Sequence, residues 1–266
     1  MTDAPLIETR GLDIGYTVRR SVRLVQAGLD LTAETGNLTC LIGPNGSGKS
    51  TLLRTLAGLQ PALGGCIRIG GEELGKQSAA RRARLIALVL TDRIEAPRLS
   101  VEDLVMLGRN PYTGWLGTPS EADRRIVREA LAQVRLEAYA HRDIDELSDG
   151  ERGRALIAKA LAQDTPAILL DEPTAHLDLP GRVEIMLLLR TLARQTHKAV
   201  LISTHELDLA LQTADRIWLL SPAGGGVRAD TPRALAADGS IQAVFGSRSF
   251  EFTGEGGGIR VTGVDD

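Results

Sequence analysis

Long hydrophobic runs are absent from this sequence of 266 residues. The longest apolar runs, at Leu85–Leu90 and Ala167–Leu170, are far shorter than the roughly 20 apolar residues that cross a bilayer. The first ten residues carry Asp3 and Glu8 and lack the basic end and apolar stretch of a signal peptide. We therefore expect a chain that does not itself span a membrane.

Cysteine and excess charge are also scarce. Only Cys40 and Cys66 are present, which favours reduced, buried thiols in the cytosol over a disulfide framework. The formal net charge of −3 and the sequence pI of about 5.9 argue against a protein that coats nucleic acid. Any contact with a nucleotide must therefore come from a local site.

What the chain does contain is an alternation of apolar strands and amphipathic helices. Residues 100–139 instead carry mainly helical patterns, with Ser100 and Ser120 as helix caps. The sequence thus predicts an α/β protein, with a mainly parallel sheet, flanking helices and an inserted helical subdomain. Strands are expected at 6–14, 38–42, 66–69, 85–90, 167–171, 199–203 and 216–220, and helices at 49–59, 78–84, 182–195 and 207–213.

A glycine-rich segment joins the strand at 38–42 to the next helix. It fits the spacing G-x-x-x-x-G-K-[ST], in which backbone N–H groups wrap a polyphosphate at a helix N-terminus. Lys49 can reach the β- and γ-phosphates, and the Ser50 hydroxyl can ligate Mg²⁺. A plain turn is the alternative, but the flanking strand and helix favour a nucleotide site. The predicted nucleotide contacts are Gly43, Pro44, Asn45, Gly46, Ser47, Gly48, Lys49, Ser50 and Thr51.

Two acids close the apolar strand at 167–171. We expect Asp171 to belong to the Mg²⁺ shell and Glu172 to polarise a water toward the γ-phosphate. An acidic strand end facing solvent would be the better interpretation of this pair alone. The phosphate loop in the same chain favours the catalytic one.

With these motifs in this order, and with Leu147-Ser-Asp-Gly-Glu151 before the acidic strand, the chain resembles the ABC ATPase family along nearly its whole length. The resemblance implies a single domain over residues 1–266, with ATP and Mg²⁺ as cofactors. Its P-loop NTPase core, with N-terminal antiparallel strands, would comprise residues 1–92 and 160–246. Residues 93–159 would form the helical subdomain, and 247–266 a C-terminal tail.

The same resemblance implies a site shared between two copies of the chain. Ser148 and the backbone of Gly150, at a helix start, would contact the γ-phosphate held by the other subunit. A simple helix cap, made by Ser148 with Glu151, fits the same residues. Asp178 would help to couple the two sites across the homodimer.

Two further residues carry roles implied by the family. His205 would act in catalysis by touching the γ-phosphate, together with Lys49 and Glu172, although a lone histidine at a strand end is often only a polar terminus. Tyr16 would stack on adenine, and an ordinary core or surface tyrosine is its alternative.

The sequence departs from the family at two places. A glutamine usually follows the strand at 85–90, and here Thr91 and Asp92 stand there. Thr91 is therefore our candidate near Mg²⁺, and either residue is a candidate for signalling to a membrane partner. The signature carries Asp149 and Glu151 in place of the usual Gly and Gln.

Members of the family that act in DNA repair carry a very long coiled coil, and those that bind ribosomes carry two ATPase domains in one chain. This sequence has neither feature. A transporter subunit remains, with a stand-alone ATPase as the alternative. Leu107–Tyr112 and Asp178–Glu184 resemble importers of iron–siderophore complexes, haem and cobalamin, although Pro111 could simply close a helix. Other importer classes stay open.

The implied protein is a homodimeric ATPase on the cytoplasmic face of the cell membrane. It would work with transmembrane permease subunits and, indirectly, with a substrate-binding protein, and with no nucleic acid. The cargo itself is not named by the sequence, because it would never touch this subunit.

Overall fold

The structure is a computed structural model that describes residues 4–18, 21–90, 98–114, 117–222, 224–246, 250–253 and 258–261. Its centre is a six-stranded sheet, parallel except for β11 at one edge. All residues of β4, β8 and β9 are buried, as expected for parallel strands covered on both faces. In order across the sheet, the strands are β11 (Val227–Asp230), β10 (Arg216–Leu220), β4 (Leu38–Ile42), β9 (Ala199–Ser203), β8 (Ala167–Asp171) and β7 (Ile86–Val89).

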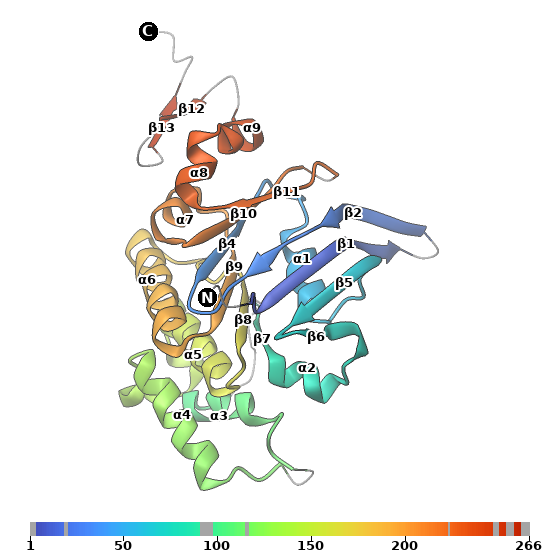
Figure 1. The fold of residues 1–266 in the computed structure, drawn as a ribbon. Helices are drawn as coiled ribbons and strands as arrows, with labels where there is room; N and C mark the ends of the chain where they lie inside the picture. Colours follow the sequence, from blue (N-terminus) through green and yellow to red (C-terminus); the bar gives the residue numbers. More distant parts are fainter. Residues whose placement is uncertain are drawn as a thin grey trace.

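A second, antiparallel sheet is built mainly from the N-terminal part of the chain. Helix α1 (Lys49–Leu56) lies between the two sheets (Figure 1). Its apolar side chains Leu52, Leu53 and Leu56 pack in one buried cluster with Leu12 and Leu169. The strands of this sheet are β1 (Ile7–Val18), β2 (Ser21–Leu29), β3 (Thr32–Ala33), β5 (Gly64–Ile69) and β6 (Glu72–Glu73).

Helix α6 (Leu179–Thr196) is bounded by local sequence signals at both ends. The Asp178 side chain caps α6 by accepting a hydrogen bond from the Gly181 N–H, and Pro180 lies in its first turn. The helix ends at His197, which adopts a left-handed conformation. The remaining C-terminal elements are α7 (Leu207–Thr213), α8 (Pro232–Ala237), α9 (Ser240–Phe245), β12 (Phe250–Thr253) and β13 (Gly258–Val261).

The helical region lies at one end of the molecule, below the sheets in Figure 1. Ser100 and Ser120 cap α3 and α4, each with the aspartate three residues on, as the sequence predicts. The expected boundary between residues 159 and 160 falls inside the continuous helix α5. The elements of this part are α3 (Val101–Met106), η2 (Leu107–Arg109), α4 (Glu121–Gln133), η3 (Glu137–Tyr139), η4 (Ile144–Glu146) and α5 (Asp149–Ala162), whereas η1 (Leu74–Lys76) and α2 (Ala79–Leu85) lie between β6 and β7 on the sheet side.

The helical region shares its core with the parallel sheet. Leu104 and Val127 of the helices belong to the same buried cluster as Leu170 of β8 and Ile185 of α6. The α/β class with an added helical region is therefore confirmed. None of the helices in the described ranges combines the length and the apolar character that a bilayer crossing requires.

Most predicted strands and helices are confirmed, and the structure also contains elements that were not predicted or that begin elsewhere. Strand β2 was not predicted, because its exposed residues Val22 and Leu24 carry no inward-facing pattern. Helix α6 begins before Arg182 because Asp178 provides the cap. Cys40 is buried as expected, whereas Cys66 is only half-buried, and both are free thiols.

Candidate active site

The phosphate loop, residues 43–48, follows the fully buried strand β4. Gly46 and Gly48 have φ angles of 80° and 104°, in the left-handed region that favours glycine. A Cβ added to Gly43 would lie 2.6 Å from the Leu220 carbonyl oxygen, and one added to Gly48 would lie 2.6 Å from Val25. The path of the loop therefore depends on these three glycines.

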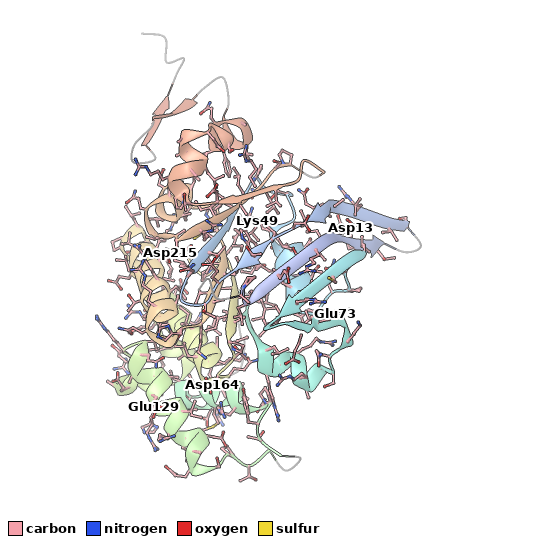
Figure 2. All side chains as sticks on the ribbon, viewed as in Figure 1. Asp13, Lys49, Glu73, Glu129, Asp164 and Asp215 are labelled. Atoms are coloured by element: carbon pink, nitrogen blue, oxygen red, sulfur yellow. The ribbon has the colours of Figure 1, made fainter. Side chains whose placement is uncertain are left out.

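Lys49 points back into this loop from the first turn of α1. Its ammonium donates hydrogen bonds to the carbonyl oxygens of Gly43, at 2.8 Å, and Pro44, at 3.3 Å. Burial lowers the pKa of Lys49, and the carboxylates at the end of β8 oppose that shift. The buried Ser47 hydroxyl has no hydrogen-bond partner among the described residues. The loop thus holds an anchored cation and a spare hydroxyl (Lys49 is labelled in Figure 2).

The carboxyl end of β8 meets the start of α1. The Ser50 hydroxyl donates to Asp171 Oδ1 at 3.1 Å, so the two predicted metal ligands lie together. Ser203, at the end of the neighbouring strand β9, donates to the same Oδ1 at 2.5 Å and accepts a hydrogen bond from the Glu172 N–H at 2.9 Å. Sequence reasoning missed Ser203, although a hydroxyl residue closing the adjacent parallel strand was the available signal.

Glu172 and His205 project from neighbouring strand ends. Glu172 has a φ of 49°, a strained conformation for this residue type, and its carboxylate lies 3.7 Å from His205 Nδ1. His205 Nε2 lies 3.1 Å from the carboxylate of Glu206, which also accepts a hydrogen bond from Arg182 at 2.5 Å. The Arg182–Glu206 pair, which the sequence did not reveal, therefore lies directly beside His205.

A hollow of about 330 Å³ opens beside the phosphate loop. Tyr16, Arg23 and Glu172 are among the residues that line it. Tyr16 and Arg23 face each other across the β1–β2 ladder, and the Arg23 guanidinium lies 5.8 Å from the centre of the tyrosine ring. Sequence reasoning missed Arg23, since the pairing of β1 with β2 was not predicted. From the phosphate loop and α1, the hollow is lined by Asn45, Gly46, Gly48, Lys49, Ser50 and Thr51.

The predicted signature residues lie elsewhere and do not line this hollow. Ser148 is exposed and caps α5, and a reciprocal pair of hydrogen bonds with Glu151 closes the cap. Hydrogen bonds from Ser148 lower the pKa of Glu151. Gly150 is half-buried in the first turn of the same helix, and Asp178 is an exposed cap. The helix-cap interpretation of Ser148 is therefore confirmed.

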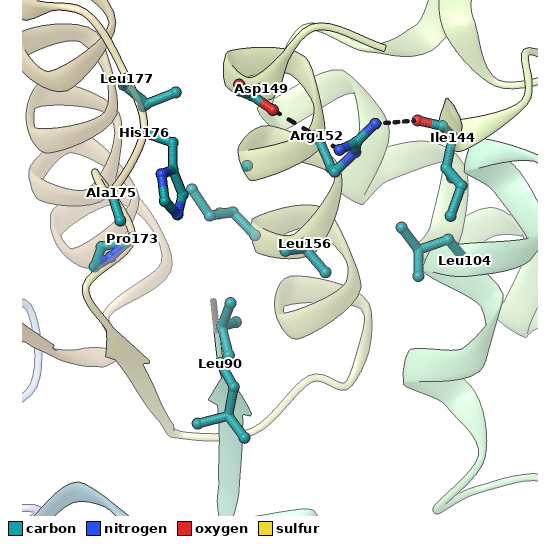
Figure 3. A pocket seen from close by; sticks show the side chains of 13 residues that line it. Leu90, Leu104, Ile144, Asp149, Arg152, Leu156, Pro173, Ala175, His176 and Leu177 are labelled. Carbon is teal, nitrogen blue, oxygen red and sulfur yellow. Dashed lines mark hydrogen bonds and ion pairs between the residues drawn. The ribbon is translucent and has the colours of Figure 1, made fainter. Parts of the chain in front are cut away.

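A second pocket lies at the start of α5, between it and the segment that follows β8 (Figure 3). His176, from the predicted coupling loop, lines this pocket together with Leu156 of α5. Arg152 lines it as well and is held by Asp149, at 3.7 Å, and by the Ile144 carbonyl oxygen, at 3.3 Å. The coupling loop and the signature helix of one chain are thus close neighbours.

The donor set at the end of β8 fits a magnesium ion. The Ser50 hydroxyl and the Asp171 carboxylate are oxygen donors beside the hollow, and Mg²⁺ characteristically takes few protein ligands alongside phosphates and water. The described part of the chain has no group of three or more His, Cys, Asp or Glu side chains able to hold a metal. Thr91, the third predicted ligand, lies outside the described residues, as does Asp92.

Comparison with known proteins places this geometry in context. A family model described as ABC transporter matches residues 27–175. The achromobactin transport ATP-binding protein CbrD of Dickeya dadantii is 42% identical over 212 residues, which cover 79% of this chain and 77% of that protein. The iron(3+)-hydroxamate import ATP-binding protein FhuC of Bacillus subtilis is 38% identical over 205 residues, covering 77% and 74%.

Solved structures agree in fold. A transporter assigned to the metal-chelate ABC type, in an inward-facing conformation, matches with a TM-score of 0.78 and 26% identity over 91% of this chain and 89% of that one. The dimeric structure of MJ0796, a bacterial ABC transporter cassette, matches with a TM-score of 0.72 and 28% identity, covering 85% and 98%.

Proposed function

The chain belongs to the ABC transporter family, and we propose that it is the ATP-hydrolysing subunit of an importer of iron chelates, haem or cobalamin. Relatives named for achromobactin and for iron(3+)-hydroxamate transport support the iron-chelate class. A structural neighbour of the metal-chelate type supports it independently.

The observation that carries ATP hydrolysis is the meeting of three groups at one hollow. Lys49 is buried in the phosphate loop, Ser50 contacts Asp171, and Glu172 lines the same space. These groups would supply charge neutralisation, a metal-binding oxygen pair and a base, which phosphoryl transfer to water requires.

We assign roles from this geometry. The phosphate loop and Lys49 bind the polyphosphate, while Ser50 and Asp171 would hold Mg²⁺, which supplies charge neutralisation at the phosphates when bound. Glu172 accepts a proton from the attacking water, and His205, held by Glu206, positions the γ-phosphate. Tyr16, with Arg23 beside it, offers a face on which adenine can stack.

Two copies of the chain would share each ATP, with Ser148 and Gly150 of one facing the phosphate loop of the other. The exposed cap of α5 and the dimeric structure of MJ0796 support this arrangement. ATP binding would favour the closed pair and hydrolysis the open one, so that separate permease subunits at the membrane alternate between two states.

The direct test is ATPase activity of the purified chain with and without Mg²⁺. Activity is expected only with Mg²⁺, and absence of hydrolysis in the presence of a partner permease would contradict the proposal. Uptake of a labelled ferric siderophore, haem or cobalamin into vesicles tests the cargo class. Uptake of an unrelated solute instead would point to another importer class, and ATPase activity that no permease stimulates would point to a stand-alone enzyme.

A further inference from the structure

The segment Leu107–Tyr112 carries the resemblance to one group of importers, yet none of its residues lines the hollow beside the phosphate loop or the pocket at the start of α5. Its contacts run instead to α2, α4 and the last turn of α5. These contacts suggest a mechanical role for the segment.

Tyr112 is the centre of the first set of contacts. The guanidinium carbon of Arg109 lies 4.1 Å from the centre of its ring, and that of Arg84, on α2, lies 5.2 Å away. Arg84 also donates two hydrogen bonds, of 3.1 and 2.9 Å, to the Pro111 carbonyl oxygen. We call the group Arg84, Arg109 and Tyr112 the stacked joint. It connects α2, which leads into strand β7, with η2 and the residues that follow it.

Arg109 extends the stacked joint into the interior. It is 6% exposed, and its Nε lies 2.9 Å from Asp123 Oδ1 at the start of α4. Its Nη1 donates to the carbonyl oxygen of Ala162, the last residue of α5, at 2.7 Å. A cation at a helix C-terminus complements the helix dipole there. One side chain therefore holds the start of α4 and the end of α5 together.

The end of α5 is held from two further directions. A Cβ on Gly108 would lie 2.3 Å from the Lys159 carbonyl oxygen, so the segment presses directly on the helix backbone. Gln163, just past α5, donates hydrogen bonds to the carbonyl oxygens of Ala83 and Ile86, at 2.7 and 3.0 Å. The last turn of α5 is therefore fixed to the strand side of the molecule, through α2 and β7.

We propose that Arg84 and Tyr112 are positioning residues for the shared ATP site, because the stacked joint sets the tilt of α5 and with it the location of Ser148. The inference rests on the proposed function. Helix α5 has 14 residues and is roughly 20 Å long. A tilt of about 10° at its fixed end would move the Ser148 end by roughly 3.5 Å, and a misplacement of about 1 Å can cost a reaction about 100-fold.

The test compares Tyr112→Ala and Arg84→Ala with Arg128→Ala, a control that removes only an exposed ion pair on α4. Arg84→Lys keeps the charge but loses the planar, two-bond contact with the loop, so an intermediate effect is expected. Tyr112→Phe keeps the ring and loses only the exposed 3.3 Å hydrogen bond from the hydroxyl to the Asp164 carbonyl oxygen, so it should stay close to the unchanged chain. The melting temperature is recorded throughout, and Arg84, which is exposed, carries the test if Tyr112→Ala does not fold.

Two readouts separate positioning from simple stability. Tyr112→Ala and Arg84→Ala should lower kcat about 10-fold or more while ATP affinity of the isolated chain changes less than about twofold. Spin labels at Lys76→Cys and Arg125→Cys, in a Cys66→Ser background, should show a broader distance distribution in Tyr112→Ala than in Arg128→Ala.

Unchanged kcat and an unchanged distance distribution in both alanine variants would overturn the proposal. A chain that hydrolyses no ATP at all would contradict the proposed function, and the spin-label distances would still report on the stacked joint. The two failures are therefore distinguishable.

Discussion

Two helix starts in this chain, those of α1 and α5, suit an anion but differ in what already occupies them. The start of α1 follows Gly48, has no side chain capping it, and lies beside the buried Lys49. The start of α5 is exposed and is capped by Ser148, whose hydroxyl is already bonded to the carboxylate of Glu151 at 2.7 Å. The first has no acidic residue in its first turn, whereas the second carries the carboxylate of Glu151.

This difference indicates a division of labour within the ATPase. Under the shared-site proposal, one chain supplies the phosphate loop, and a partner reaches its second anion site by displacing Glu151 from Ser148. Variants at each end should therefore have separable effects, which we rank from the largest.

Replacing Glu172 should have the largest effect, because it removes the base and leaves the phosphate loop of α1 intact. Glu172→Gln should slow ATP hydrolysis at least ~100-fold with ATP binding retained. Glu184→Gln, which alters an exposed carboxylate on α6, is the matched control. Near-normal turnover in Glu172→Gln, measured by phosphate release, would remove Glu172 from this role.

ATP binding by the isolated chain should depend on the start of α1 and not on the start of α5. Lys49→Ala removes a charged contact to the polyphosphate and should weaken ATP affinity by roughly 10- to 100-fold. Ser148→Arg should leave that affinity within about twofold, since Ser148 serves the partner. ATP affinity is measured by titration below the dimerisation concentration. Equal losses of affinity in the two variants would contradict the proposed difference between the two helix starts.

Arg23 should contribute a smaller share at the α1 end. Arg23→Ala removes the cation beside Tyr16 and should weaken ATP binding by about two- to fivefold, the usual worth of such an exposed contact. Arg10→Ala, on the neighbouring strand and outside the hollow, is the control. No difference between the two variants would exclude Arg23 from the site.

The smallest effect is expected for Glu151, whose carboxylate lies at the start of α5. Glu151→Gln should tighten ATP-driven dimerisation by about two- to threefold, because a negative charge no longer competes with the phosphate at the helix start. Weaker dimerisation, measured by sedimentation in the Glu172→Gln background, would contradict this account.

The same variant has a pH signature. Hydrogen bonds from Ser148 lower the pKa of Glu151, so its stabilising contribution is present above the pKa it has in the unfolded chain. That contribution is lost as the pH falls through the lowered pKa. The melting temperature of the unchanged chain should therefore fall more steeply below about pH 4.5 than that of Glu151→Gln.

The α1 end could be predicted from the sequence because it is local. A buried strand, a spaced set of glycines and a helix are contiguous, and the acidic pair after β8 joins them through parallel strand ends. Ser203, Glu206 and Arg182 reach the site only through strand order and helix packing, which local patterns do not encode. Arg23 could not be predicted as a site residue, because this required the pairing of β2 with β1. The exposed residues of β2 form no inward-facing apolar pattern.

At the helical end, the helix caps could be predicted from the sequence but the stacked joint could not. The capping pair of Ser148 and Glu151 was readable from their spacing, as were the caps at Ser100 and Ser120. The stacked joint was not, because Arg84 and Tyr112 are distant in sequence and meet only in the fold. Resemblance indicated the importer group of the segment Leu107–Tyr112, whereas only the contacts indicate what the segment does.

The most direct test of the shared site mixes two inactive chains. Lys49→Ala disables a chain's own phosphate loop, and Ser148→Arg disables what it lends to its partner. A mixed dimer then contains one site with both defects and one with neither. We predict that ATPase activity, or at least ATP-dependent dimerisation, reappears when the two variants are combined. Recovery of neither, or full activity of Ser148→Arg as a monomer, would contradict the account.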